Sequence, residues 1–199
     1  RQLFPWGVQF GGSASVLFKQ EEDLSGDVEQ ESEEELSGHV IIIGYGINGQ
    51  NLATVLKNTH IPFCVVEMNA GLVRLAREEG APVVVGDATR LTILKHAGVV
   101  RARAMVVGIN DVQATRRIVS IARAACPGLH IVVRTQYVAE LEELMKRGAD
   151  VVVPAEYEAS VKIFSHVLEE LDVPRNILGA QIAAVRAGGY GVFRGKSSG

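Results

Sequence analysis

Short, unbroken runs of apolar residues alternate with amphipathic segments over most of the chain after Ser37. This pattern is typical of parallel strands that are buried on both faces between crossover helices. It predicts six strands, at residues 39–43, 62–67, 82–85, 104–109, 130–134 and 150–153. It predicts helices between and after them, at residues 48–58, 70–79, 91–97, 112–125, 138–147 and 155–171.

The strict alternation of strands and helices predicts an α/β fold, a doubly wound parallel sheet of the Rossmann type. Right-handed crossovers favour the strand order 3-2-1-4-5-6, which places a ligand crevice at the carboxyl ends of the first and fourth strands. After residue 171, a further stretch of helically spaced apolar residues predicts a seventh helix. The apolar face of this helix packs either on its own sheet or on a second subunit, and the sequence leaves both open.

Composition divides the chain into an acidic flexible linker (1–37), the Rossmann domain (38–173) and a C-terminal helical extension (174–199). Residues 20–36 carry nine acidic residues and no basic one, so this run is expected to repel itself and stay extended. The aromatic residues at positions 4, 6 and 10 are either part of this tether or a hook for a membrane interface or a partner.

The rest of the composition narrows the classes of protein and of site. From residue 38 onward there are 18 Lys and Arg against 14 Asp and Glu, without a dense basic stripe, so nucleic acid is not an expected partner. No apolar run approaches the roughly 20 residues of a membrane span. Cys64 and Cys126 form no CxxC pair, and the five histidines show no metal-ligand spacing. We expect a soluble domain in a reducing cytosol, with no metal.

A complete G-x-G-x-x-G pattern follows the first predicted strand directly and opens the next helix. This is the context of a dinucleotide-binding fingerprint. Gly44 permits the tight turn, Gly46 lets a phosphate approach the backbone, and Gly49 lets the helix pack closely on the sheet. The phosphate then lies on free N–H groups at the positive end of the helix. The predicted binding loop is Gly44, Tyr45, Gly46, Ile47, Asn48 and Gly49.

Glu67 ends the second predicted strand, 18 residues after the last glycine of the loop. This is close to the spacing of an acid that accepts hydrogen bonds from ribose hydroxyls. Alone, Glu67 could equally be a helix-start acid or a solvent-facing strand end. Beside the glycine loop, it favours ribose binding, and its charge disfavours NADP because it would repel a 2′-phosphate.

Candidate ligand residues also follow the third, fourth and fifth predicted strands. Asp87 and Ala88 lie where the loop after the third strand borders an adenine pocket, and Asp87 either meets the base or caps a helix. Asn110 follows the fourth strand at the crevice. Arg134 ends the fifth strand, where its guanidinium reaches either an anionic group of a ligand or a rim acid such as Glu156.

Together these motifs resemble the TrkA-N (RCK/KTN) family of potassium-transport regulators, especially the cytosolic domains of Kef-type potassium efflux antiporters. The resemblance runs from about Ser37 to Phe193. It is strongest at residues 37–46, 86–89, 114–119 and 148–154. The family's nucleotide contacts fall here on Gly44, Gly46, Asn48, Gly49, Glu67, Asp87, Ala88 and Arg134.

The resemblance implies a domain that binds NAD(H) or an adenine nucleotide such as AMP or ADP. It implies a homodimer at the cytoplasmic face of the cell membrane, which gates potassium transport by a transmembrane transporter domain of the same polypeptide. Only 26 residues follow Val173, too few for a second lobe of the TrkA-C kind. This favours an antiporter tail over a regulatory subunit of a Trk/Ktr-type uptake system.

Two other classes of function compete with this interpretation. An NAD-dependent oxidoreductase would use the same fingerprint but needs a substrate domain and a positioned acid or base. The Tyr-x-x-x-Lys pattern of short-chain dehydrogenases is absent, since Leu141 stands four residues after Tyr137. A pure scaffold with a decayed pocket would have no need of the glycines and Glu67. We therefore expect a regulatory domain and not an enzyme.

Overall fold

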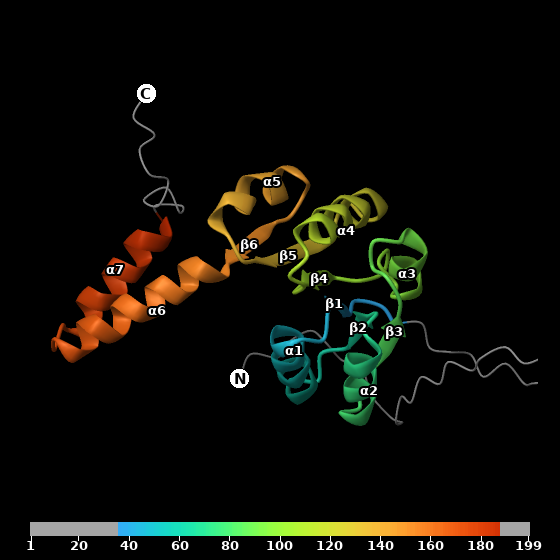
Figure 1. Ribbon diagram of the computed structural model, residues 1–199, viewed down its shortest axis with the longest axis horizontal. Coiled ribbons are helices and arrows are strands. Elements are labelled where there is room, and N and C mark those ends of the chain that lie inside the picture. The colour runs from blue at the N-terminus through green and yellow to red at the C-terminus, as the bar shows by residue number, and fades with distance from the viewer. Residues whose placement is uncertain (1–35, 188–199) are drawn as a thin grey trace, which may run out of the picture.

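Six parallel strands form a single sheet at the centre of the molecule (Figure 1). The computed structural model describes residues 36–187. The strands are β1 (Val40–Ile43), β2 (Phe63–Glu67), β3 (Val83–Val85), β4 (Ala104–Val107), β5 (His130–Thr135) and β6 (Val151–Pro154). Their order is β3-β2-β1-β4-β5-β6, which confirms the predicted doubly wound topology. Each strand differs from its predicted range by no more than two residues at either end.

The register of the sheet brings the carboxyl ends of the central strands to one edge. Ile43, the last residue of β1, pairs with Val66 of β2 on one side and with Val107 of β4 on the other. Glu67 ends β2 one residue later, opposite Val85 at the end of β3. The loops after these strands therefore start at the same level, which is where open α/β sheets bind ligands.

Helices cover both faces of the sheet (Figure 1). The helices of the described chain are α1 (Ile47–Asn58), α2 (Ala70–Glu78), α3 (Leu91–His96), α4 (Val112–Ala125), α5 (Leu141–Lys146), α6 (Ala155–Glu170) and α7 (Arg175–Ala187), of which the last two project from the sheet. The helix predicted at 138–147 is split, because residues 138–140 form a 3₁₀ turn before α5. In that turn the amide of Glu140 bonds to the carbonyl of Tyr137, three residues earlier.

Alternate residues of β1 enter two separate hydrophobic clusters, as the two-residue period of a strand requires. Ile41 and Ile43 lie in the larger cluster, with buried residues of α3, α4 and α5. Ile42 lies in the smaller cluster, with buried residues of α1 and α2. The strands are thus buried on both faces, which explains their unbroken apolar sequences.

The last two helices form a hairpin that projects from the sheet (Figure 1). Within the described chain α7 packs on α6, and the buried Tyr157 of α6 donates a hydrogen bond of 2.5 Å to the carbonyl oxygen of Val185. The sequence left open whether α7 packs on its own sheet or on a second subunit. Within the described chain its partner is α6 and not the sheet. In residues 36–187, no helix combines the length and apolar character needed to cross a membrane. The predicted linker and its aromatic residues lie almost entirely outside the described part.

Candidate functional site

The glycine loop joins β1 to α1 at the carboxyl edge of the sheet. Gly44 has φ +93°, a left-handed conformation in which L side chains are strained, and an added Cβ would lie 2.8 Å from Ile109 Cγ2. A Cβ on Gly49 would lie only 2.1 Å from the carbonyl oxygen of Gly44. The first turn of α1 therefore packs directly on the loop, a closer contact than the helix-to-sheet packing expected from the sequence.

The amino end of α1 opens toward the space above the loop. Gly46 is the N-cap residue, no side chain caps this end, and the first turn contains no acidic residue. The amide of Gln50 is the first to bond back into the helix, at the carbonyl of Gly46, so the amides at 47–49 precede the first helical hydrogen bond. A Cβ on Gly46 would meet nothing within 4 Å. Ile47 is highly exposed beside this space. These are the features of an anion site at a helix N-terminus.

Glu67 connects the glycine loop to the end of β2. Its Oε2 accepts a hydrogen bond of 2.8 Å from the amide of Tyr45. Its Oε1 accepts two more, each 2.8 Å, from the amides of Met68 and Asn69. A carboxylate offers about four acceptor positions, so one remains open on Oε2. The side chain is buried and its charge is stabilised by three N–H dipoles, so it is neither a helix-start acid nor a solvated strand end.

Tyr45 points away from the ligand edge. Its side chain is 2% exposed and lies in the cluster beneath α1 and α2. The hydroxyl donates a hydrogen bond of 2.6 Å to Glu79 Oε2, and the carbonyl accepts one from Gln50 Nε2. Burial and the hydrogen bond to the Glu79 carboxylate raise the pKa of the phenol well above its usual range. Tyr45 therefore shapes the loop from below, and its side chain offers no surface to a ligand.

The loop after β3 contains Asp87 and Ala88. Asp87 Oδ1 accepts a hydrogen bond of 2.8 Å from the amide of Thr89, and bonds from the backbone and hydroxyl of Thr89 lower the pKa of the carboxyl. Asp87 thus closes a local turn, whereas the N-cap residue of α3 is Arg90. Ala88 is buried in the larger cluster, so only its backbone is available to a ligand.

Arg134 crosses the gap between the loops after β4 and β5. Its Nη1 donates to Asn110 Oδ1, and its Nη2 donates to Gln136 Oε1 at 2.9 Å. Glu156, the acid proposed as a rim partner, instead accepts a hydrogen bond of 2.8 Å from the amide of Val138. Among the described residues, Arg134 makes no ion pair, so its charge is held by two neutral amide oxygens.

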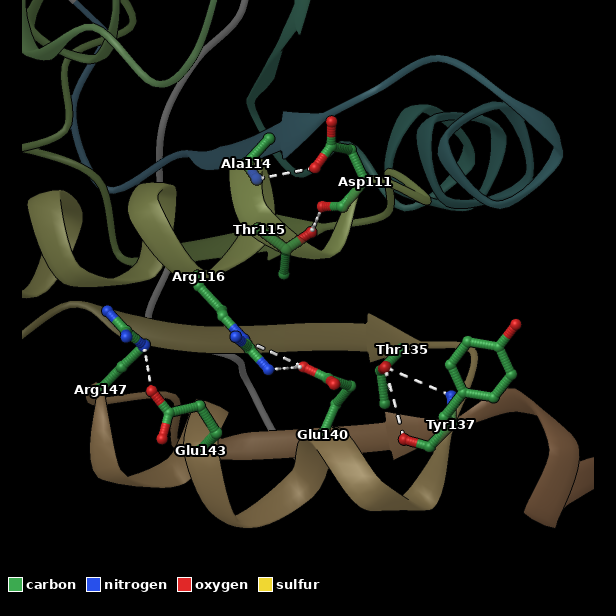
Figure 2. Close-up of polar contacts among 9 residues, drawn as sticks. All are labelled: Asp111, Ala114, Thr115, Arg116, Thr135, Tyr137, Glu140, Glu143 and Arg147. Atoms are coloured by element: carbon green, nitrogen blue, oxygen red, sulfur yellow. Dashed lines mark hydrogen bonds and ion pairs between the residues drawn. The ribbon is translucent and has the colours of Figure 1, made fainter.

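A small, partly open pocket of about 10 Å³ lies at the ends of β4 and β5. Thr115 and Glu140 line it together with Arg134 and Asn110. Asp111 caps α4 at its rim, where Oδ1 accepts from the amide of Ala114 (Figure 2). A pocket of this size has room for about one water molecule.

The contacts form two groups, one around Glu67 and one around Arg134. In residues 36–187 no hydrogen bond joins the two groups, and no three His, Cys, Asp or Glu side chains converge on a metal-binding arrangement. Two exposed apolar side chains, Met68 and Val85, flank Glu67 and were not among the predicted site residues. Met68 is 70% exposed, and its place directly after the acid was a signal that could have drawn attention to it.

Comparison with known proteins identifies the relatives of this chain. The TrkA-N domain family model matches residues 40–155. A protein of Alkalimonas amylolytica named for K⁺ efflux antiporter activity, KefB, is 32% identical over 84% of this chain and 25% of its own length. A glutathione-regulated potassium-efflux system protein of Haemophilus influenzae is 31% identical over 71% of this chain and 23% of its own length. The chain thus spans about a quarter of each relative.

Solved structures share the fold. The TrkA-N domain of the inner membrane protein ybaL from Escherichia coli is 30% identical, with a TM-score of 0.63 over 65% of this chain and 96% of that one. The AMP-bound Kef C-terminal domain of Shewanella denitrificans is 21% identical, with a TM-score of 0.66 over 75% of this chain and 90% of that one. The NAD-bound GsuK channel is 24% identical, with a TM-score of 0.58 over 68% of this chain and 24% of that one. Because the family match covers more than half of its residues, the chain belongs to the TrkA-N domain family.

Proposed function

We propose that residues 38–173 bind an adenine nucleotide, AMP, ADP or NAD(H), and regulate a potassium efflux antiporter. The observation that carries the proposal is the hydrogen bond between Glu67 and the amide of Tyr45. It holds the carboxylate that we propose binds the ribose against the glycine loop that we propose binds the phosphate. The open acceptor position on Glu67 Oε2 fits a ribose hydroxyl. The uncapped start of α1 and the open space at Gly46 fit a phosphate.

The surroundings of Glu67 fit an adenosine. Met68 and Val85 supply exposed apolar surface on either side of the acid, against which a base can pack. Asp87 is already held by Thr89, so we propose that the backbone of Asp87 and Ala88 meets the base. Three amides at the start of α1 and the charge of Arg134 provide for the phosphates.

The names of the relatives support regulation of potassium efflux. Two relatives more than 30% identical are named as potassium-efflux proteins, and each is about four times as long as the matching part. We propose that the remainder of such a protein includes a transmembrane transporter, with this domain on its cytoplasmic face. Nucleotide binding would change the free-energy difference between two packings of the domain and so bias the transporter between closed and open states.

We further propose that two copies associate through α6. Ile163, Val167 and Leu171 are spaced four residues apart, so they lie along one side of the helix. Their exposed fractions are 65%, 54% and 67%, although α7 already covers another side of α6. An exposed apolar stripe on a projecting helix marks an interaction surface.

Two other functions compete with this proposal. The TrkA-N family match alone also fits a subunit that regulates a Trk/Ktr-type uptake system, but both relatives are named for potassium efflux. An NAD-dependent oxidoreductase requires an acid or base beside the nicotinamide, whose expected place is the half of the crevice at β4 and β5. There the ionisable side chains that line the cavity are Arg134 and Glu140, and Glu140 pairs with Arg116 at 2.8 Å. This arrangement supports a regulatory role over an enzymatic one.

Calorimetric titration of the chain with AMP, ADP, NAD and NADH tests the nucleotide site. At least one of them should bind with a submillimolar Kd. Glu67→Gln should weaken it about tenfold to hundredfold, because the ribose and three amides lose a charged acceptor. Glu170→Gln, at an exposed position of α6, is the matched control.

Adenosine should bind more weakly than AMP, since it lacks the group that the start of α1 holds. Circular dichroism of the Glu67→Gln variant must show retained fold for the comparison to count. Titrations in which none of the four nucleotides binds the wild-type chain would contradict the proposal and favour a scaffold. Hydride turnover with a small carbonyl substrate would favour the oxidoreductase.

A further inference from the structure

The positive surplus of the domain is confined to one stretch of sequence. Residues 87–150 contain ten Lys and Arg against six Asp and Glu, whereas residues 38–86 and 151–199 are each balanced. Residues 87–150 form α3, α4 and α5, which pack on the face of the sheet that carries the larger hydrophobic cluster. The three helices on this face, with Arg147 at the end of α5, carry six Lys and Arg against two Glu, and we call it the positive face.

An open groove of about 550 Å³ lies on the outer side of α4 on this face. It is lined by Gln113, Arg116, Arg117, Ser120 and Ile121 of α4 and by Arg147 at the end of α5. Three arginines thus line the groove, and no Asp or Glu is among its lining residues.

Two of the three arginines are held from the α5 side. Arg116 pairs with Glu140 at 2.8 Å, and Arg147 pairs with Glu143 at 2.7 Å (Figure 2). These pairs fix the guanidinium groups of two residues that line the groove. Arg117 makes no ion pair in the described part of the chain, although its charge contributes to lowering the pKa of Asp87. The groove therefore presents preorganised donors and one cation without a carboxylate partner.

The chain enters the domain on this same face. Leu36 packs against the cluster that α3, α4 and α5 cover. Its carbonyl accepts a hydrogen bond of 3.2 Å from Arg101 Nε, and the amide of Gly38 donates one of 2.8 Å to the carbonyl of Arg101. The residues that precede Leu36 therefore start from the positive face.

We infer that the groove binds the acidic run, residues 21–35, of the same chain. This run carries nine carboxylates and no base, and it is joined to the positive face through Leu36. Fifteen residues reach up to about 50 Å, more than twice the length of α4, so the tether does not limit the contact. Each exposed ion pair contributes little free energy, but the contributions of several pairs formed by one tethered segment add up. The pairs also reduce the repulsion among the carboxylates of the run.

The consequence is a linker whose position depends on ionic strength. At low salt the run lies on α4. Added salt shortens the distance over which the opposite charges attract each other, so the acidic run is released from α4. The inference does not rest on nucleotide binding, so it stands or fails separately from the proposed function.

Paramagnetic broadening in the full chain tests the contact. A spin label is attached at Ser32→Cys in a Cys126→Ser background; Cys64 is buried with a pKa raised to about 12, so it does not react. At low salt, the amide signals of Gln113, Ser120 and Arg147 should broaden in ¹⁵N-labelled protein. Arg117→Glu with Arg147→Glu should abolish the broadening. Lys162→Glu with Arg175→Glu makes the same change of charge on α6 and α7 and should preserve it.

Cleavage by a glutamate-specific protease gives an independent measurement. The run should be cut about fivefold faster in the Arg117→Glu/Arg147→Glu variant than in wild type. The difference should disappear at high salt. Absence of broadening at low salt would overturn the inference, as would equal broadening in both double variants. Broadening that arises only between a labelled and an unlabelled molecule, and is lost on dilution, would assign the groove to a second copy.

Discussion

The hydroxyl of Tyr45 donates a hydrogen bond of 2.6 Å to Glu79, which joins the glycine loop to the carboxyl end of α2. The amide of Tyr45 is held by Glu67 at the end of β2, and its carbonyl by Gln50 of α1. Each polar group of this one residue is thus bound by a different element. The loop has its shape before any ligand arrives, which lowers the cost of ordering on binding.

Tyr45→Phe removes the hydroxyl and keeps the ring in its cluster. We expect the free energy of unfolding to fall by about 1 kcal/mol, because one hydrogen bond to an exposed carboxylate is lost. We also expect nucleotide affinity to fall a few-fold, because the amide that bonds Glu67 is less well fixed. Urea unfolding and calorimetric titration measure the two effects.

Tyr137→Phe is the control for Tyr45, since its side chain is half exposed on the loop before α5. Glu79→Ala should reproduce the loss of affinity, and the double variant should lose no more than either single one. Additive losses would show that Tyr45 and Glu79 act separately.

Gly49→Ala should disrupt the site through the backbone. The added Cβ would lie 2.1 Å from the carbonyl oxygen of Gly44, so the loop or the helix must move. We expect a loss of about 2–3 kcal/mol in the free energy of unfolding, typical of forced overpacking, together with loss of nucleotide binding. Thermal unfolding with and without AMP measures both.

Gly179→Ala is the matched control, because Gly179 lies within α7 and an added Cβ would meet nothing within 4 Å. It should stabilise the helix by about 0.5–1 kcal/mol and leave nucleotide affinity unchanged. If Gly49→Ala bound AMP as tightly as wild type, the close approach of α1 to the loop would have no role in binding.

The fold followed from the sequence because its signals are local. Apolar runs of four to six residues, each followed by an amphipathic segment, fix the strand order through the handedness of crossovers. Even so, the helix at 138–147 was wrong in its first turn, which is a 3₁₀ turn. A periodicity argument gives one helix there, because it cannot tell a 3₁₀ turn from the start of an α-helix.

The site was predictable only where spacing sets the geometry. Glu67 was predictable because β1 and β2 are neighbours whose carboxyl ends lie at the same edge, so the end of β2 lies beside the loop after β1. The direction of Tyr45 depends on α2, which packs over the loop only in the folded chain, so no pattern near Tyr45 points to Glu79. The partners of Arg134 were not predicted for the same reason. The sequence shows that Glu156 is present, but not that its carboxylate already accepts the amide of Val138, which leaves Arg134 to Asn110 and Gln136.

Val167→Glu tests the proposed association through α6. Dimerisation would remove water from a charge in the middle of the apolar stripe. Burying a charge without a partner costs free energy and so opposes association. We expect the variant to be monomeric by light scattering at concentrations at which wild type is dimeric, with unchanged helix content. Lys162→Gln, on the exposed surface of the same helix, should leave the mass unchanged. A wild-type chain that is monomeric at high concentration would refute the dimer.

His39 should make the fold sensitive to acid. It is fully buried before β1, Nε2 bonds to the carbonyl of Ala97 at 2.8 Å, and Nδ1 has no hydrogen-bond partner among the described residues. Burial lowers the pKa of the imidazole below its usual 6.5, an effect that the charge of Arg101 reinforces and the hydrogen bond to Ala97 opposes. The folded state therefore holds a neutral ring, whereas the unfolded chain takes up a proton below about pH 6.5.

Because the unfolded state binds more protons there, stability is complete above pH 6.5 and is lost as the pH falls toward the pKa of the folded state. The free energy of unfolding should decrease by up to about 1.4 kcal/mol per pH unit in that window, as measured by urea unfolding between pH 8 and pH 5. His39→Gln keeps a donor for Ala97 and removes the titration, so its curve should be flatter. His166→Gln, at an exposed position on α6, should keep the wild-type slope, and an unchanged slope in His39→Gln would place the proton uptake elsewhere.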